Sequence, residues 1–489
     1  MWQGATSSRI CSRQPTNVAV IQQTMTLKGE IMTTTYRYSA AFNDLATLLT
    51  GQLVLPEDAN YEEVRQLWNG KVKTQPAAIA RCLTVQDVIH TICWTRAHNL
   101  PFSVRGAGHE IFGRSLLGNG MVIDLSQMKA VTVDPDKRTA QIQAGATAGD
   151  LIEATQKYGL ATATGTISSV GMTGLTLGGG YGPLNGAYGL AADNLLSAQV
   201  VTADGQLITT NAKENADLLW GLRGGGGNFG VVVSLEFRLH PLTTVLSGLL
   251  LYPLEQARTV LHRLNEFIAT TPDELTIRSG FLHISDGQTV LFLSPTYCGS
   301  LEMGEQAIAP LRTFGTVLVD QMQSVSYHEL IHSSDAFTPK GRHYYLQTQS
   351  LKGLQTETIE ALIEQGLPLP SPFSAINIHN FHGAASRVGV SETAFALRQD
   401  HLMVELIAAW EPQDDEQRYI QWAQNLSRSL APYAFKGGYI NLLSEPEQER
   451  VRLAFGSNYE RLLDLKQKYD PEDVFQSTIG HLAPHSLTR

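Results

Sequence analysis

Two glycine-bearing segments constrain this chain more than any other feature of its sequence. They read VRGAGHEIFG (104–113) and GTISSVGMTGLTLGGGYG (165–182). Glycine recurs in both where a side chain would keep the backbone away from a ligand, and neither segment has the apolar periodicity of a packed helix or strand. The sequence therefore predicts two binding loops between the elements of one domain.

The first loop places three small residues between Arg105 and His109. Consecutive small residues let backbone N–H groups turn inward as an anion-binding nest, and Arg105 would add a planar donor fork for a phosphate. A loop histidine is either a hydrogen-bonded structural group or a reactive one. The residues themselves leave both interpretations of His109 open.

The second loop is too rich in glycine for a helix. Its cluster Gly178, Gly179, Gly180 and Gly182 suggests close backbone approach to a large flat or phosphorylated ligand. It matches neither the P-loop spacing nor the G-x-G-x-x-G nucleotide signature. The glycine pattern indicates a cofactor without specifying which.

Composition excludes several classes of protein. A length of 489 residues exceeds what one core usually holds, so two domains are expected. The net charge of −10 and the pI near 5.8 argue against nucleic acid or an anionic membrane surface as partner. The four cysteines lack metal-ligand spacing, so no metal is expected. No stretch approaches the roughly 18 apolar residues of a membrane span, and 1–31 lacks a signal-peptide pattern, so a cytoplasmic location is the default.

A series of motifs in a fixed order identifies a family. The chain carries RGAGHEIFG, VIDLSQM, AGATAGDLI, YGLATATG, VGMTGLTLGGGYGPLNGAYGLAADNL, ADLLWGLRGGGGNFGVV and NYERLLDLKQKYDPEDVF. This series resembles the berberine bridge enzyme-like flavoproteins of the vanillyl-alcohol oxidase superfamily, which have a PCMH-type FAD-binding domain. The resemblance implies FAD as cofactor, and His109 matches the histidine that this family bonds covalently to the flavin 8α-methyl group.

The two loops and the family motifs together predict the cofactor site. Besides His109, the predicted cofactor-binding residues are Arg105, Gly106, Ala107, Gly108, Gly113, Ser115, Gly165, Val170, Gly171, Gly174, Gly230, Val232 and Asn441.

Hydrophobic patterning predicts an α+β fold. Residues 61–242 alternate helices and strands, including a helix that begins after Thr84 and a hairpin that turns at Asp204 and Gly205. Residues 247–433 contain alternating strands separated by amphipathic helices, which predicts an antiparallel sheet covered by helices on one side. The free face of that sheet would be the substrate wall opposite the flavin.

The predicted domain boundaries follow from these patterns and the resemblance. We expect an N-terminal extension, partly disordered, over 1–59, a PCMH-type FAD-binding domain over 60–244 and a substrate-binding domain over 245–433. Residues 434–489 resemble the family's return to the FAD domain. Residues 1–31, up to Met32, are interpreted as a disordered extension or a start assigned too far upstream.

Glu405 is a candidate catalytic base. It is the only charge in the apolar strand HLMVELIAAW, where an ionised carboxylate needs a wet cavity or a partner. The alternative is an edge strand with Glu405 facing bulk water. The resemblance implies the substrate-facing position, where the pKa of a carboxylate would be raised to suit a general base.

Two tyrosines are further catalytic candidates. Tyr439 and Asn441 form Y-I-N, and residues i and i+2 of an extended segment share a face. The resemblance places this tyrosine beside the substrate and the asparagine near the flavin, and it implies that Tyr188 lines the active site. The alternative for both tyrosines is packing.

Departures from the family motifs refine these expectations. Many members attach the flavin a second time through a cysteine where this chain has Ile167, so a single covalent link to His109 is expected. The tail QSTIGHLAP lacks the family's N-x-N-like element, which puts contacts by that tail in doubt. Val170 stands where a small residue is associated with oxygen access, which favours an oxidase.

The predicted function is an FAD-dependent oxidase that takes a hydride from a small organic substrate (an alcohol, sugar or natural product), with O₂ as acceptor. The alternatives are an amine oxidase of the 6-hydroxy-D-nicotine oxidase type, a dehydrogenase with another electron acceptor, and a flavin-binding module without turnover. Glu405 and Tyr439 favour the alcohol or sugar, because an alcohol must lose its hydroxyl proton.

Overall fold

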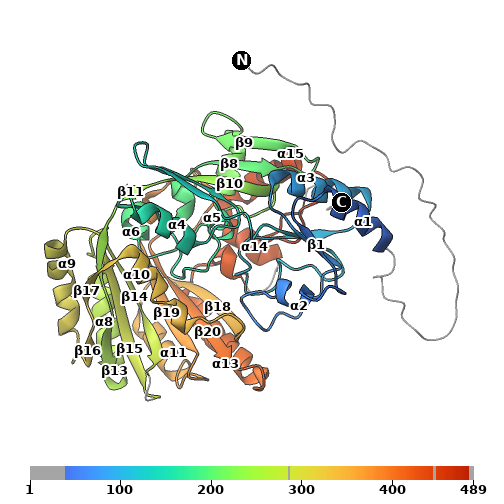
Figure 1. The fold of residues 1–489 in the computed structure, drawn as a ribbon. Helices are drawn as coiled ribbons and strands as arrows, with labels where there is room; N and C mark the ends of the chain where they lie inside the picture. Colours follow the sequence, from blue (N-terminus) through green and yellow to red (C-terminus); the bar gives the residue numbers. More distant parts are fainter. Residues whose placement is uncertain (1–38, 285–286, 444–447, 479, 484–489) are drawn as a thin grey trace.

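The computed structural model describes residues 39–284, 287–443, 448–478 and 480–483. Helices and strands occur throughout both halves of the chain, which confirms the predicted α+β class (Figure 1). The interpretation of residues 1–31 lies outside the described residues. No helix in the described ranges is both long and apolar enough to cross a membrane.

The first sheet of the N-terminal half has the strand order β1-β2-β4-β3, in which β4 runs parallel to β2 and β3. Every residue of β4 is buried. Helix α3 (Val85–Ala97) packs on this sheet and begins at Thr84, where a capping box with Asp87 satisfies the free backbone donors, as predicted. The strands are β1 (Gln52–Val54), β2 (Ala78–Arg81), β3 (Phe102–Arg105) and β4 (Met121–Asp124).

Residues 39–54 pack as part of this unit. Helix α1 (Ser39–Leu48) places Phe42 against Trp94 of α3, with ring centroids 5.3 Å apart, and β1 pairs with β2. Residues 39–54 therefore belong to the folded unit, which differs from the predicted extension over 1–59.

The second sheet of this half has the order β5-β6-β10-β8-β9. The buried strand β10 lies at its centre, and β8 and β9 form the predicted hairpin, in which Gly205 adopts the left-handed φ of +78° that the turn requires. The bounds are β5 (Val131–Asp134), β6 (Thr139–Gln143), β8 (Leu195–Val201), β9 (Leu207–Asn211) and β10 (Val231–Arg238), with helices α4 (Ala148–Gln156), α5 (Met172–Leu177), α6 (Asn185–Tyr188) and α7 (Ala216–Leu222).

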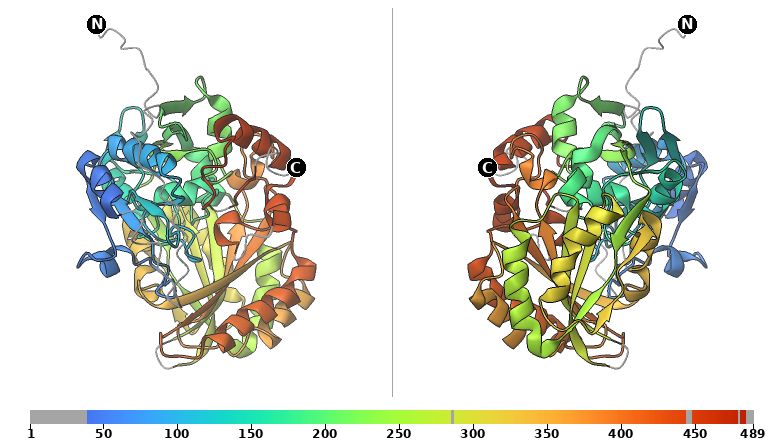
Figure 2. Two further views of the ribbon diagram at one scale, coloured as in Figure 1. Left: turned by 90° about the vertical axis from the view of Figure 1, so that its right-hand side faces the viewer. Right: turned by 90° about the vertical axis from the view of Figure 1, so that its left-hand side faces the viewer.

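The C-terminal helices pack beside this second sheet (Figure 2). Helices α14 (Gln448–Phe455) and α15 (Tyr459–Tyr469) contribute Phe455 and Leu462 to the hydrophobic cluster that contains Phe229 and Phe237. This shared cluster supports the proposed return of residues 434–489 to the FAD domain.

The large sheet of the C-terminal half is antiparallel throughout, with the order β16-β13-β15-β14-β19-β20-β18. Strand β12 also pairs with β15, and β17 pairs with β12. Along β19, Ile376 and Ile378 enter the core beneath the helices, whereas Asn377 and His379 face the opposite side and line a cavity. This confirms the predicted sheet with helices on one face. The strands are β12 (Thr244–Ser247), β13 (Leu250–Pro253), β14 (Leu275–His283), β15 (Thr289–Tyr297), β16 (Val319–Asp320), β17 (Gln323–Ser326), β18 (His343–Leu351), β19 (Ala375–Phe381) and β20 (His401–Trp410), and helices α8 (Ala257–Ile268), α11 (Thr356–Glu364) and α13 (Glu416–Leu430) contribute to the cluster on the covered face.

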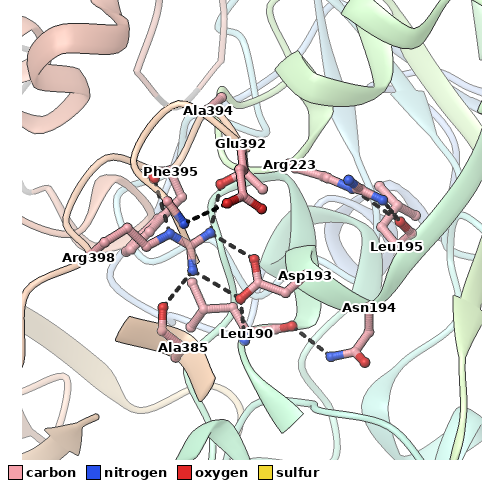
Figure 3. A network of polar contacts seen from close by, with 12 residues as sticks. Leu190, Asp193, Asn194, Leu195, Arg223, Ala385, Glu392, Ala394, Phe395 and Arg398 are labelled. Atoms are coloured by element: carbon pink, nitrogen blue, oxygen red, sulfur yellow. Dashed lines mark hydrogen bonds and ion pairs between the residues drawn. The ribbon is translucent and has the colours of Figure 1, made fainter. Parts of the chain in front are cut away.

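A buried ion pair fastens the connection between β19 and β20 to the N-terminal half (Figure 3). The guanidinium of Arg398 donates to both carboxylate oxygens of Asp193, at 3.0 and 2.7 Å, and to the carbonyl of Ala385 at 2.8 Å. The backbone of Phe395 donates to the carbonyl of Arg223 at 3.1 Å. The bonds to Asp193 and Arg223 therefore tie the connection before β20 to the N-terminal half.

Candidate active site

A cavity of about 610 Å³ lies between the two glycine loops and the open face of the large sheet. Residues 106–111 and 165–167 line one side of the cavity, and residues of β14, β19 and β20 line the other. The loop side combines glycines with His109 and Glu110, whereas the sheet side carries polar residues such as Asn377, His379 and Glu405. The predicted substrate wall is thus the wall that faces the loops.

His109 is held in the first loop by a stack of aromatic rings. Its imidazole lies on Trp68 with ring centroids 4.4 Å apart, and Trp68 stacks in turn on Tyr344 of β18 at 4.0 Å. The Nε2 atom is buried and has no hydrogen-bond partner among the described residues. Burial lowers the pKa of His109 to about 4. The imidazole is therefore neutral at pH 7, with a ring nitrogen free to react.

Arg105 does not serve the predicted phosphate role. It lies outside the cavity lining, and its guanidinium donates to Asp124 on the neighbouring strand, at 3.1 and 2.5 Å, and to the carbonyl of Val64 at 2.6 Å. The residue alternates across β3, so its side chain points into the protein rather than toward the loop's ligand. Arg105 stabilises the base of the loop.

Several loop glycines contact protein rather than the cavity. A Cβ at Gly113 would meet Val72 at 2.8 Å, and one at Gly178 would meet the Asn441 side chain at 2.0 Å. A Cβ at Gly182 would meet the carbonyl of Thr164 at 1.8 Å. The expectation that the 178–182 cluster approaches a ligand is wrong. These glycines instead allow the chain to pack closely behind the site.

The other predicted cofactor-binding residues line the cavity. Gly174 has open space where a Cβ would stand, and the hydroxyl oxygen of Ser115 is buried without a hydrogen-bond partner among the described residues. Ile167 also lines this wall. The predicted residues that line the cavity are Gly106, Ala107, Gly108, His109, Ser115, Gly165, Val170, Gly171, Gly174, Gly230, Val232 and Asn441.

Glu405 faces the cavity from the interior of the sheet. Its strand β20 lies between β19 and β18, so the edge-strand alternative is wrong. The Oε2 atom is 3.1 Å from Nε2 of His379 and accepts a bond of 3.4 Å from the amide of Asn377. These contacts satisfy the carboxylate on one side and leave it in contact with the cavity on the other.

The pKa of Glu405 moves in the direction opposite to the prediction. Burial alone would raise the pKa, but the imidazole of His379, the amide of Asn377 and the positive charge of Arg278 outweigh burial and hold it below its ordinary value. Glu405 is therefore an ionised carboxylate at neutral pH, able to accept a proton without first losing one.

Tyr439 and Asn441 are neighbours, although not in an extended segment. Residues Ile440–Leu442 form a 3₁₀ turn, and the amide of Asn441 donates to the Tyr439 oxygen at 2.8 Å across it. The backbone N–H of Gly180 donates to the same oxygen at 3.0 Å. Burial nevertheless raises the pKa of Tyr439 to about 12. The phenol is a neutral hydrogen-bonding group at the cavity wall rather than a phenolate.

Tyr188 does not line the cavity, which contradicts its prediction. Its ring stacks on His240 with centroids 4.1 Å apart, and its hydroxyl donates to the carbonyl of Pro241 at 3.4 Å. The tyrosine that does line the cavity is Tyr181, whose hydroxyl lies 2.6 Å from Nε2 of His401. The packing alternative for Tyr188 is therefore correct.

Reasoning from the sequence missed four groups at this site. These are the Trp68 ring beneath His109, the Arg278 guanidinium, and the Asn377 and His379 side chains beside Glu405. The pattern INIHNF indicated Asn377 and His379, because these polar residues alternate with two isoleucines and therefore share one face of a strand. Nothing in the sequence indicated Trp68, since it precedes the family motifs and contacts His109 only in the folded protein.

The residues at the loop wall fit FAD. A neutral histidine nitrogen and a serine hydroxyl face the cavity without partners, and bare backbone at Gly106 and Gly174 allows a flat ring system or a phosphate to approach. The fold and the site together define an FAD-dependent oxidoreductase.

Comparison with known proteins leads to the same class of protein. The family model "FAD binding domain" matches residues 76–211, and "Berberine and berberine like" matches residues 438–480. The FAD-linked oxidoreductase YgaK of Bacillus subtilis is 31% identical over 442 residues, which cover 88% of this chain and 96% of that relative. The chain belongs to the berberine bridge enzyme-like family of FAD-linked oxidoreductases.

Three further similarities concern oxidases. The (R)-6-hydroxynicotine oxidase of Paenarthrobacter nicotinovorans is 29% identical over 451 residues, with 88% of this chain and 97% of that protein covered. The crystal structure of 6-hydroxy-D-nicotine oxidase from Arthrobacter nicotinovorans superposes with a TM-score of 0.81 at 28% identity, covering 88% of this chain and 97% of the other. A chitooligosaccharide oxidase shares the fold, with a TM-score of 0.80 at 24% identity and coverage of 91% and 99%.

Proposed function

We propose that this protein is an oxidase that removes a hydride from an alcohol carbon of a small organic substrate, a sugar or a natural product. The hydroxyl proton is taken up by the protein, the product is a carbonyl compound, and O₂ is reduced to H₂O₂. Bound FAD supplies the two-electron acceptor that links the two half-reactions. The observation that carries the proposal is the ionised Glu405, paired with His379, on the wall that faces the His109 loop.

The FAD is held by a single covalent bond to His109. The neutral imidazole with its unpaired Nε2 supports this assignment, because nucleophilic attack needs a free nitrogen lone pair. Ile167 lines the same wall and has no thiol, so a second bond from that position is chemically excluded. The stack on Trp68 fixes the plane of the imidazole.

Glu405 acts as the general base. Its carboxylate reaches the cavity, and the contact with His379 at 3.1 Å orients it and offers a route for the accepted proton. Tyr439, with its raised pKa, holds the substrate oxygen as a neutral phenol. This assigns most of the rate to Glu405 and a smaller part to Tyr439.

Oxygen is the acceptor of the second half-reaction. Val170 lines the loop wall, and its side chain is smaller than that of leucine or isoleucine, so it should obstruct a small gas molecule less than those residues would. The small side chain of Val170 is the feature that favours an oxidase over a dehydrogenase with another electron acceptor.

The test is a two-stage measurement on the purified yellow protein. Anaerobic mixing with panels of alcohols, sugars and amines is followed by the loss of flavin absorbance, and air is then admitted and peroxide is measured. Bleaching by an alcohol or sugar followed by stoichiometric peroxide is the expected result. A flavin that dithionite reduces but that none of the panel reduces would instead identify a binding module without turnover.

An amine oxidase is the second candidate. The identity of 29% with (R)-6-hydroxynicotine oxidase favours it. A neutral amine can lose a hydride without losing a proton at the same time, so a base is not required. Glu405→Gln would then leave amine oxidation nearly unchanged, whereas alcohol oxidation would fall sharply.

A further inference from the structure

We propose that the substrate of this protein carries a carboxylate, and that Arg278 is the residue that recognises it. This inference specifies the substrate class of the proposed oxidase and rests on that function. It concerns the part of the cavity formed by β14, β15 and β19, beside the Glu405–His379 pair.

Arg278 stands in the row of polar side chains on the open face of the sheet. It is the register partner of His379 on β19 and of Ser294 on β15. Its side chain lines the main cavity and also a small adjoining pocket of about 40 Å³ whose other polar lining residues include Ser294 and Thr296. The guanidinium therefore lies where the substrate wall meets this polar recess.

The guanidinium has no hydrogen-bonded partner in the protein. Within the described residues it makes no hydrogen bond or ion pair, its central carbon lies 5.8 Å from the centre of the Phe292 ring, and the charge of Glu405 acts on it without direct contact. Burial lowers the pKa of Arg278 and the charge of Glu405 opposes that effect, but an arginine side chain remains charged in proteins. A half-buried guanidinium whose N–H groups have no acceptor is costly, so a ligand that supplies anionic oxygen acceptors should occupy the site during function.

The other charged groups of the cavity already have partners. Glu110 bonds to Arg114 at 3.3 Å, Arg342 lies 3.4 Å from Glu411, and Glu405 is engaged with His379. Among the described acids, only Glu110 and Glu405 line the main cavity. Of the three arginines that line the cavity, Arg278 is thus the one without an ion-pair partner among the described residues.

A carboxylate matches the geometry of this donor. A guanidinium presents two parallel N–H groups to the two oxygens of a carboxylate, and a single arginine neutralises its one charge. The body of the ligand would lie against the aromatic residues that line the same cavity, Phe292, Phe337 and Phe373. An aromatic or other apolar acid with a hydroxyl group therefore fits the site.

The experiment compares two nearly isosteric probes on the flavin-loaded protein. Benzoate and benzamide have the same ring but differ in charge. Benzoate is an anion that the Arg278 guanidinium would bind, and benzamide is neutral. Binding is measured by calorimetry and by the change in the flavin spectrum. Wild type should bind benzoate about 10- to 100-fold more tightly than benzamide. Arg278→Gln should remove this preference, and Arg278→Lys should keep part of it.

Arg342→Gln is the matched control, because Arg342 also lines the cavity but already has Glu411 as its partner. This variant should retain the wild-type ratio of the two affinities. Equal affinities in wild type, failure of benzoate to bind, or an unchanged ratio in Arg278→Gln would each overturn the proposal. Loss of flavin in Arg278→Gln with an unchanged ratio would overturn it too, and would assign Arg278 to the cofactor.

The binding result separates this inference from the proposed function. If no alcohol or hydroxy acid reduces the flavin but benzoate still binds through Arg278, the oxidase proposal fails and the anion site stands. If neutral alcohols are oxidised and benzoate does not bind, the oxidase stands and the anion site fails.

Discussion

The two walls of the cavity work by different means. The loop wall offers glycines and other small residues together with His109 and the Glu110–Arg114 pair, whereas the sheet wall offers the charged and polar groups Arg278, Asn377, His379 and Glu405. A flat cofactor needs close backbone approach, which fixes residue types strongly. A substrate is selected by side chains on a rigid sheet, which can change without changing the fold. The loop wall therefore identifies the family, and the sheet wall holds the information about the substrate.

The largest expected effect concerns the loop wall and its attachment to the flavin. His109→Ala should abolish covalent flavin attachment completely, because the only proposed nucleophile is removed. Acid precipitation measures this directly: wild type should keep its yellow colour in the pellet, and the variant should release it into the supernatant.

Trp68→Phe serves as the companion to His109→Ala. It keeps an aromatic ring beneath the imidazole, so covalent attachment should persist. Wild-type protein that loses all its flavin on acid precipitation would show that the covalent proposal is wrong.

The next largest effect concerns the proposed base on the sheet wall. Glu405→Gln should lower the rate of anaerobic flavin reduction by about 10² to 10⁴, because the amide cannot take the hydroxyl proton. Flavin content should stay unchanged, since Glu405 lies on the other wall. Stopped-flow absorbance measures the rate, and Glu236→Gln, a glutamate in strand β10 bonded to Ser197, is the matched control with a normal rate.

The pH profile of kcat/KM sharpens the same test. The pKa of Glu405 is depressed, so the base is ionised at neutral pH and activity falls only as the pH drops through this lowered pKa. The acid limb of wild type should therefore lie below the ordinary glutamate range, and it should be absent in Glu405→Gln. An acid limb that persists in the variant would assign the base to another group.

The same contrast explains what the sequence could predict. The helix after Thr84, the hairpin at Gly205 and the helix-covered sheet follow from local patterns that depend on neighbouring residues. The direction of Arg105 could not be predicted, because its partner Asp124 lies on a strand that pairs with its own only after folding.

Electrostatics of the site were also beyond local patterns. The raised pKa expected for Glu405 considered burial alone, whereas His379, Asn377 and Arg278 reach it from two other strands. The prediction for the glycines at 178–182 was wrong for a related reason. A sequence shows where a side chain is missing, but it does not show whether a ligand or another part of the protein fills the space. At Gly178 the Asn441 side chain fills it.

A third prediction concerns oxygen at the loop wall. Val170→Leu adds one methylene to the lining and should slow reoxidation by O₂ about tenfold, which corresponds to about 1.4 kcal/mol on the barrier. Reduction by substrate should be unaffected, because the sheet wall is unchanged. Mixing of reduced protein with air-saturated buffer in a stopped-flow instrument measures the rate. Equal rates for both proteins would remove Val170 from the oxygen path, and slow reoxidation of wild type would make the protein a dehydrogenase.

The smallest effect tests Tyr439, which lines the cavity beside the second loop. Tyr439 accepts hydrogen bonds from Gly180 of the second loop and from Asn441. Tyr439→Phe leaves both donors unpaired, which should lower the free energy of unfolding by about 1–3 kcal/mol and the rate of flavin reduction by about two- to tenfold. Tyr252→Phe is the matched control. The buried hydroxyl of Tyr252 donates to Leu311 on the helix-covered side, so this variant should lower stability and leave the rate unchanged.

Since burial raises the pKa of Tyr439 to about 12, the phenol stays neutral across the assay range and its loss should not move the acid limb of the pH profile. A loss in Tyr439→Phe larger than that in Glu405→Gln would reverse the two roles and make the tyrosine the base.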